Sequence, residues 1–164
     1  MKIEILIKTS DLKQLTPRSY DPEEDDVRSI LIDICHSIEG QVDFKVSGFG
    51  QDRWPVDTST DLAVFLEQLP NAIRALKNRQ PTNIDFYEQG IERYLKISQS
   101  DDCDIYQIFC ASNTNWKPNP ETEKIHITEL LKILSAAKDN FLQIINEISP
   151  SLTNHPWITE WKNA

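Results

Sequence analysis

Residues 84–95 read IDFYEQGIERYL, a strand-like pattern that carries several charged residues and has a glycine near its centre. If Gln89-Gly90 forms a two-residue hairpin turn, Glu88 and Arg93 lie on one sheet face with the flanking apolar residues. If Gly90 is instead a bulge in one long strand, the side-chain phase shifts and both charges still lie on that apolar face. A carboxylate and a guanidinium on an apolar face are costly unless they pair. We therefore expect a buried or half-buried ion pair between Glu88 and Arg93.

Three roles are open for this pair. It can fix the strand register, contribute to a ligand or partner site, or take part in catalysis. Glu92, the other carboxylate of the stretch, should face the opposite side of the sheet from Glu88 in either geometry. The two carboxylates are then not placed to share acid–base chemistry. The pattern favours a structural role, and it makes Glu88, Glu92 and Arg93 candidate site residues without indicating a reaction.

Apolar residues recur at helical spacing in three parts of the chain. These parts predict amphipathic helices at 22–39, 59–78 and 127–148. The first helix is expected to begin at Asp21-Pro22, which reads as an N-cap followed by a first-turn proline. Pro70 falls inside the second pattern, where it either kinks the helix or begins another one.

Alternating apolar and polar residues predict the strands, which are expected at 2–8, 42–46, 84–95 and 105–111. The resulting order is β-α-β-α-β-β-β-α. We therefore predict a single α+β domain over residues 1–164, with a mostly antiparallel sheet packed by about three amphipathic helices.

Composition restricts the classes of partner. The chain is 39% hydrophobic and 26% charged, which is typical of a globular protein and not of a disordered one. Its formal net charge is −9, with acidic blocks at 21–26 and 100–104. Such a charge disfavours nucleic acid and anionic membrane surfaces as partners and favours a basic protein. No apolar run approaches the roughly 20 residues of a membrane helix, and residues 1–8 lack the apolar core of a signal peptide, so we expect a cytoplasmic protein.

No catalytic set, cofactor motif or metal site is evident. The three histidines are far apart in the sequence, and the three cysteines fit neither a disulfide framework nor a C-x-x-C zinc pattern. Gly48-Phe49-Gly50 lacks the remaining residues of a phosphate-binding loop. We therefore expect no catalytic residue, no metal ligand and no cofactor.

Two tryptophans stand in turn-rich loops: Trp54 in the loop at 48–57 and Trp116 in the loop at 112–120. Aromatic residues in loops either close the ends of the core or anchor an interface. In an alternative function, the protein is a small-molecule enzyme or ligand-binding domain with its pocket between these loops. Trp54 and Trp116 would line that pocket, and Asp57, Glu88 and Arg93 would supply its polar contacts.

Several phrases of the sequence occur together in a recognisable combination. They are GFG at 48–50, WPVD at 54–57, DLAVFLEQLP at 61–70, FYEQGIER at 86–93 and WKP at 116–118. Over roughly residues 42–161 the chain resembles a family of small, acidic, uncharacterised bacterial proteins. Its size and charge are also similar to those of immunity proteins that neutralise secreted toxins. The resemblance implies an α+β fold in the bacterial cytosol and carries over no catalytic residue.

These observations favour a non-catalytic, acidic protein-binding domain, and an immunity-like neutraliser of a basic protein is its concrete version. The candidate binding residues are Trp54, Asp57, Glu88, Glu92, Arg93 and Trp116.

Overall fold

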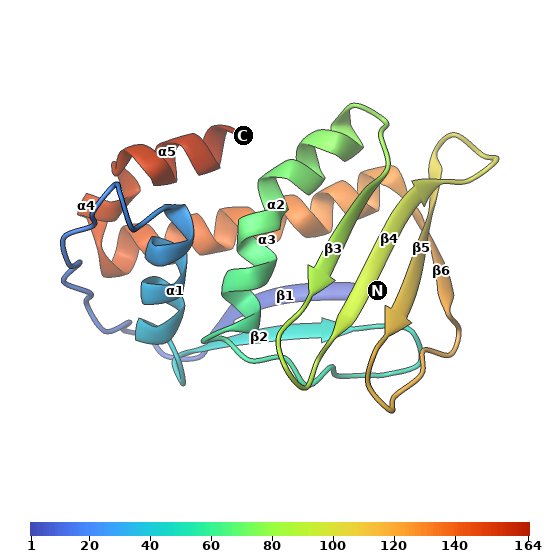
Figure 1. Ribbon diagram of the computed structural model, residues 1–164, viewed down its shortest axis with the longest axis horizontal. Coiled ribbons are helices and arrows are strands. Elements are labelled where there is room, and N and C mark those ends of the chain that lie inside the picture. Colours follow the sequence, from blue (N-terminus) through green and yellow to red (C-terminus); the bar gives the residue numbers. More distant parts are fainter.

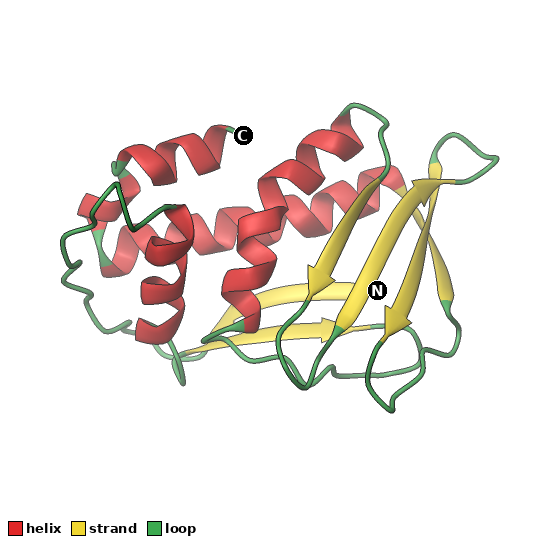
Figure 2. Cartoon of the chain, in the orientation of Figure 1, coloured by secondary structure: helices red, strands yellow, loops and turns green.

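The computed structural model describes all 164 residues and has an α+β architecture. The strands form a four-stranded antiparallel sheet of order β3-β4-β5-β6 and a separate antiparallel pair, β1-β2 (Figure 1). Figure 2 shows the four-stranded sheet at one end of the molecule and most of the helices at the other. In chain order the elements are β1 (Lys2–Ile7), α1 (Val27–Ser37), β2 (Val42–Ser47), α2 (Asp61–Lys77), β3 (Thr82–Phe86), β4 (Arg93–Gln99), β5 (Ile105–Ser112), β6 (Thr122–His126), α3 (Ile127–Ile148), α4 (Pro150–Thr153) and α5 (Pro156–Asn163).

The predicted fold class is confirmed, with additions. The strands divide into two sheets instead of one, and β6, α4 and α5 were not predicted. Strand β6 carries only one buried apolar residue, Ile125, so its five residues show no alternation of apolar and polar side chains. None of the helices combines the length and apolar composition that crossing a membrane requires.

The first helix begins later than predicted, at Val27 instead of residue 22. Asp26 is the N-cap, and its carboxylate accepts a hydrogen bond of 2.8 Å from the backbone N–H of Arg28. The carboxylate of Asp21 caps a turn before the helix, accepting from the N–H of Glu23 at 3.0 Å. Either aspartate can cap a helix, and the one next to the apolar stripe does so because helix stability comes mainly from packing of that stripe.

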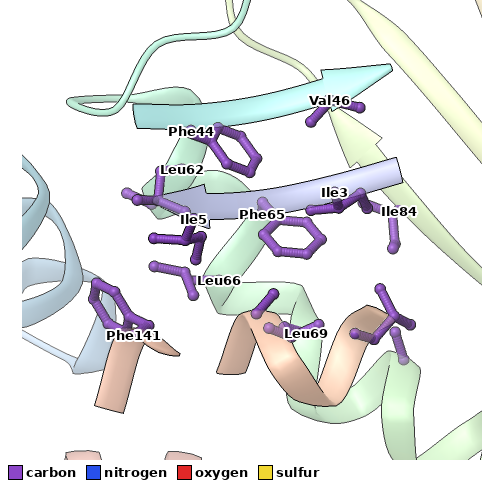
Figure 3. Close-up of a cluster of buried hydrophobic side chains, with 14 of the residues drawn as sticks. Ile3, Ile5, Phe44, Val46, Leu62, Phe65, Leu66, Leu69, Ile84 and Phe141 are labelled. Atoms are coloured by element: carbon purple, nitrogen blue, oxygen red, sulfur yellow. The ribbon is translucent and has the colours of Figure 1, made fainter. Parts of the chain in front are cut away.

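The long helix α3 and the kinked helix α2 enclose the core from two sides. Helix α3 has the predicted bounds and packs against β1, α2 and β6. Figure 3 shows the buried side chains that meet between β1-β2 and these helices. Phe65 of α2 stacks on Phe44 of β2 and on Phe86 of β3, with ring centroids 5.5 and 6.1 Å apart. These rings join the two sheets through α2.

The hairpin β3-β4 is confirmed, but both predicted geometries of its turn are wrong. Phe86 lies opposite Arg93, so residues 87–92 form a six-residue connection instead of a two-residue turn or a bulge. The backbone of this loop has positive φ at Gly90 and also at Glu92, where φ is 37°. The inner face is as predicted, because Ile84, Phe86 and Leu95 are all buried on it together with Arg93.

Helix α2 continues through Pro70, and Figure 1 shows that the helix is bent along its length. Proline has no N–H, so the carbonyl of Leu66, four residues earlier, loses its helical donor. The indole N–H of Trp161 in α5 donates to this buried oxygen at 2.8 Å. The proline in α2 thus leaves the carbonyl of Leu66 without a helical donor, and Trp161, 95 positions from Leu66, supplies one.

This arrangement predicts an energetic coupling between Pro70 and Trp161. The substitution Trp161→Phe removes the donor and leaves a buried carbonyl unsatisfied, which costs about 1–3 kcal/mol. In the background of Pro70→Ala, residue 70 regains an N–H and can satisfy Leu66 itself. We expect Trp161→Phe to be less costly in that background by about 0.5–2 kcal/mol, measured by urea unfolding of the four proteins. The packing lost with the indole costs the same in both backgrounds, so only the hydrogen bond to Leu66 can make the two costs differ. If Trp161→Phe costs the same free energy of unfolding in the wild type and in Pro70→Ala, the proposed role of this hydrogen bond is wrong.

Candidate functional site

Three of the predicted site residues meet at the inner face of the hairpin. The guanidinium carbon of Arg93 lies 4.4 Å from the ring centroid of Trp54 and 3.6 Å from that of Trp116. The two indole centroids are 6.1 Å apart. Arg93 is only 2% exposed and Trp54 only 1% exposed, whereas Trp116 is half-buried. We call these three residues the tryptophan–arginine cluster.

The predicted ion pair between Glu88 and Arg93 is wrong. No carboxylate pairs with Arg93, and its Nε and Nη1 atoms are buried without a hydrogen-bond partner. The physical reason is the longer hairpin loop, which takes Glu88 out of the strand before its side chain can point inward. The π faces of the two indoles are the electrostatic partners of the guanidinium instead.

Glu88 and Glu92 lie at separate places around the loop. Glu88 lines a hollow of about 320 Å³ between α1 and the start of α2, next to Tyr87. Glu92 lines another hollow, of about 230 Å³, beside Tyr94, an outward-facing residue of the sheet. The expectation that the two carboxylates face opposite sides of the sheet is not met, because both residues lie in the connection at 87–92, outside the strands.

The loops that bring the two tryptophans together are held by backbone contacts. The N–H of Asn119 donates to the carbonyl of Phe49 at 2.9 Å, and the N–H of Trp54 donates to Val46 at 2.8 Å. Gly50 has φ of 79°, and a Cβ atom there would lie 2.0 Å from the carbonyl oxygen of Asn119. Only glycine therefore allows the loop at 48–57 to approach the loop at 112–120 this closely.

The cluster fills the space in which the alternative function placed a ligand pocket. The guanidinium contacts both indoles, and of the three cluster residues only Arg93 lines a surface hollow, the one of about 230 Å³ beside Glu92. Burial lowers the pKa of Arg93 to about 10, so the side chain remains charged at neutral pH. This arrangement holds the two loops against the sheet.

The cluster predicts an unusual order of stabilities for substitutions of Arg93. Arg93→Met removes a buried charge whose N–H groups are unsatisfied, which stabilises the fold, but it also removes the cation–π contact. Because these two effects offset each other, the free energy of unfolding of this variant should stay within about 1 kcal/mol of the wild-type value. Arg93→Lys keeps the charge as a compact, strongly hydrated ammonium that cannot lie flat on both rings, and it should lose about 2 kcal/mol or more. Urea unfolding at neutral pH measures both values. A lysine variant as stable as the methionine variant would overturn this reading.

Asp57 is part of a second polar arrangement, at the start of α2. Its carboxylate accepts from the N–H of Thr60 at 2.6 Å and from the hydroxyl of Ser59 at 3.1 Å. Burial acts against ionisation, but these hydrogen bonds lower the pKa of Asp57 below its usual value. Asp57 thus fixes the entry into α2.

Asp61, one turn later, is a buried carboxylate that the sequence analysis missed. It is 3% exposed; one oxygen accepts from the N–H of Asp57 at 2.8 Å and the other has no partner. Burial raises its pKa to about 6, and the charges of Asp57 and Glu88 act in the same direction. The spacing of Asp57 and Asp61, two like charges four residues apart at a helix start, was the available signal.

Asp61 predicts a pH-dependent stability. Between about pH 4 and 6 the folded state binds a proton that the unfolded state does not, so this residue destabilises the fold less as the pH falls through that range. Asp61→Asn should stabilise the protein by about 1–3 kcal/mol at pH 7.5, and the gain should nearly vanish at pH 4. Urea unfolding at both pH values tests this, with Asp52→Asn, an exposed aspartate, as the control. If Asp61→Asn gives the same gain in stability at both pH values, the gain does not come from removing the ionised carboxylate of Asp61.

The largest cleft lies between α2 and α5 and has a volume of about 1140 Å³. Asp26, Glu67 and Glu160 contribute carboxylates to its lining, and the half-buried indole of Trp157 forms part of its wall. Arg74 is the one basic side chain of the lining. Local sequence patterns did not reveal this cleft, because α5 meets α2 through long-range contacts, among them the hydrogen bond of Trp161 with Leu66.

Comparison of the chain with models of protein families, with curated proteins and with solved structures gives no match in any of the three.

Proposed function

We propose that the protein is a non-catalytic domain that binds a basic protein partner, and that the partner docks in the cleft between α2 and α5. The observation that carries the proposal is the charge of this cleft. Asp26, Glu67 and Glu160 contribute three carboxylates to its lining and Arg74 contributes one guanidinium, on a chain with a net charge of −9. Arg28 pairs with Glu67 at 3.0 Å, so Asp26 and Glu160 are the carboxylates of the lining that form no ion pair. A surface of this kind attracts basic partners and steers their approach.

The neighbouring acidic block extends the charge beyond the cleft. Arg18 neutralises part of it by pairing with Asp25 at 2.7 Å and with Asp33 at 2.9 Å. Glu23 and Glu24 are exposed and form no ion pair, so their charges face solvent near the cleft residue Asp26. A basic partner approaching the cleft would therefore meet unpaired carboxylates first.

The aromatic wall of the cleft supports binding of a protein segment. Trp157 packs edge-to-face on Tyr20, at 6.2 Å between ring centroids, which fixes its indole while leaving it half-buried. Rigid, partly exposed tryptophans are common anchors in protein interfaces. At about 1140 Å³ the cleft exceeds the usual size of a small-molecule pocket and suits a stretch of polypeptide. An immunity-like protein that neutralises a basic toxin in the bacterial cytoplasm is the concrete form of the proposal.

The test begins with capture of the partner from the native source and purification of the pair. Association rates are then measured at about 50 and 500 mM salt, and we expect the rate to fall about tenfold or more. Finding no protein partner, or one whose association rate does not depend on salt, would refute the proposal.

Charge reversal locates the docking surface. Glu160→Lys changes an exposed carboxylate of the cleft that forms no ion pair, and it should slow association about threefold to tenfold. Asp101→Lys makes the same charge change in the exposed turn between β4 and β5, at the opposite end of the molecule (Figure 1). This control should have little effect. Equal slowing by both variants would show that net charge acts and that the cleft is not the docking site.

A further inference from the structure

Four basic side chains converge on a hollow of about 350 Å³ at the far end of α2. Arg74 and Lys77 come from the last turn of α2, Lys138 from α3, and Lys162 from the last turn of α5. No acidic side chain lines this hollow. On a chain with a net charge of −9, such a concentration of positive charge is unexpected from composition alone.

The ends of helices explain part of this pattern. Cations are stabilised in the last turn of a helix by the helix dipole, which accounts for Arg74, Lys77 and Lys162 taken one at a time. Lys138 has no such explanation, because it lies in the middle of α3. It is half-buried, and its ammonium donates to the carbonyl of Lys162 at 2.8 Å, which fixes it at the hollow.

The positive charges at the hollow repel one another and have no acidic side chain of the lining as a partner; Ala164, the last residue, also lines the hollow. None of the four residues forms an ion pair within the chain. Burial lowers the pKa of Lys138, and the charges of Lys77 and Lys162 lower it further, while Asp139 acts in the opposite direction. An anion in the hollow would remove this repulsion and supply acceptors for the free N–H groups.

We infer that this hollow binds the phosphate groups of a small phosphorylated molecule that carries at least two negative charges. Ammonium groups recognise phosphate as point charges, and a guanidinium adds a planar fork of donors. A volume of about 350 Å³ is at the lower end for ligand pockets and suits a diphosphate group. Two or more charges are required because the chain as a whole repels anions. The hollow adjoins the acidic cleft, with which it shares Pro70 and Arg74, but the inference does not depend on the proposed protein partner.

Pyrophosphate is the probe for this inference. The melting temperature of the protein is measured in increasing sodium pyrophosphate at pH 7.5, and against sodium chloride of equal ionic strength. Binding to the folded state raises the melting temperature by mass action, so we expect a saturable rise in pyrophosphate that sodium chloride does not reproduce. Pyrophosphate should bind more tightly than orthophosphate, and acetate should show no effect. Equal rises in pyrophosphate and in sodium chloride would overturn the inference.

Two single substitutions place the site. Lys77→Gln and Lys162→Gln each remove one exposed charge from the hollow, and each should raise the dissociation constant for pyrophosphate about threefold to tenfold in calorimetric titration. Lys124→Gln removes one exposed charge from β6, away from the hollow, and should leave the constant unchanged. The same loss of affinity in all three variants would show that the anion responds to overall charge and would refute the site.

Discussion

The carbonyl oxygen of Leu66 needs a donor that its own helix cannot supply, because Pro70 stands where the donor would be. Trp161 supplies it from α5, and this one hydrogen bond joins the central helix to the last helix of the chain. Helix α2 also packs against α1, α3 and β3, so the position of α5 is set relative to the whole core. Pro70 itself lines both the acidic cleft and the basic hollow. Both surface features therefore depend on the way α5 fits the bend.

Two buried charges without counter-ions show how differently a fold can accommodate ionisation. Arg93 keeps its proton and uses the faces of Trp54 and Trp116 as its partners. Asp61 has a single backbone donor and instead shifts its pKa towards neutrality. Neither charge contributes to the acidic or basic surfaces, since both are more than nine-tenths buried. Groups that cost stability in this way are commonly retained for the geometry they impose, and Arg93 holds two loops while Asp61 holds the entry into α2.

Sequence patterns predicted the parts of the fold that local periodicity determines. The bounds of α3 were correct because eight apolar residues follow one helical stripe up to Ile148 and Pro150 then begins a new helix. The hairpin was also found, since Ile84, Phe86 and Leu95 alternate across its strands. The length of the hairpin loop was not predicted. Glu92 has a left-handed backbone conformation, which glutamate rarely adopts, and the sequence gives no sign of it.

Only three of the six candidate binding residues come together in the structure. Trp54, Arg93 and Trp116 do meet, as their loop and strand positions suggested, yet they form a filled cluster in place of a pocket. The acidic cleft and the basic hollow escaped prediction because their residues come from α2, α3 and α5, which are distant in sequence. Their meeting depends on packing angles and on the contact between Trp161 and Leu66, which no local pattern records.

The distribution of the four tryptophans gives the molecule two separate optical reporters. Trp54 and Trp116 share the environment of Arg93 near the four-stranded sheet, whereas Trp157 and Trp161 belong to α5 at the cleft. The emission of Trp157, which is half-buried, should respond to a molecule that enters the cleft, while that of Trp54 reports on the folded state of the hairpin and its loops. Intrinsic fluorescence can thus follow occupancy of one end of the protein and unfolding of the other in the same sample.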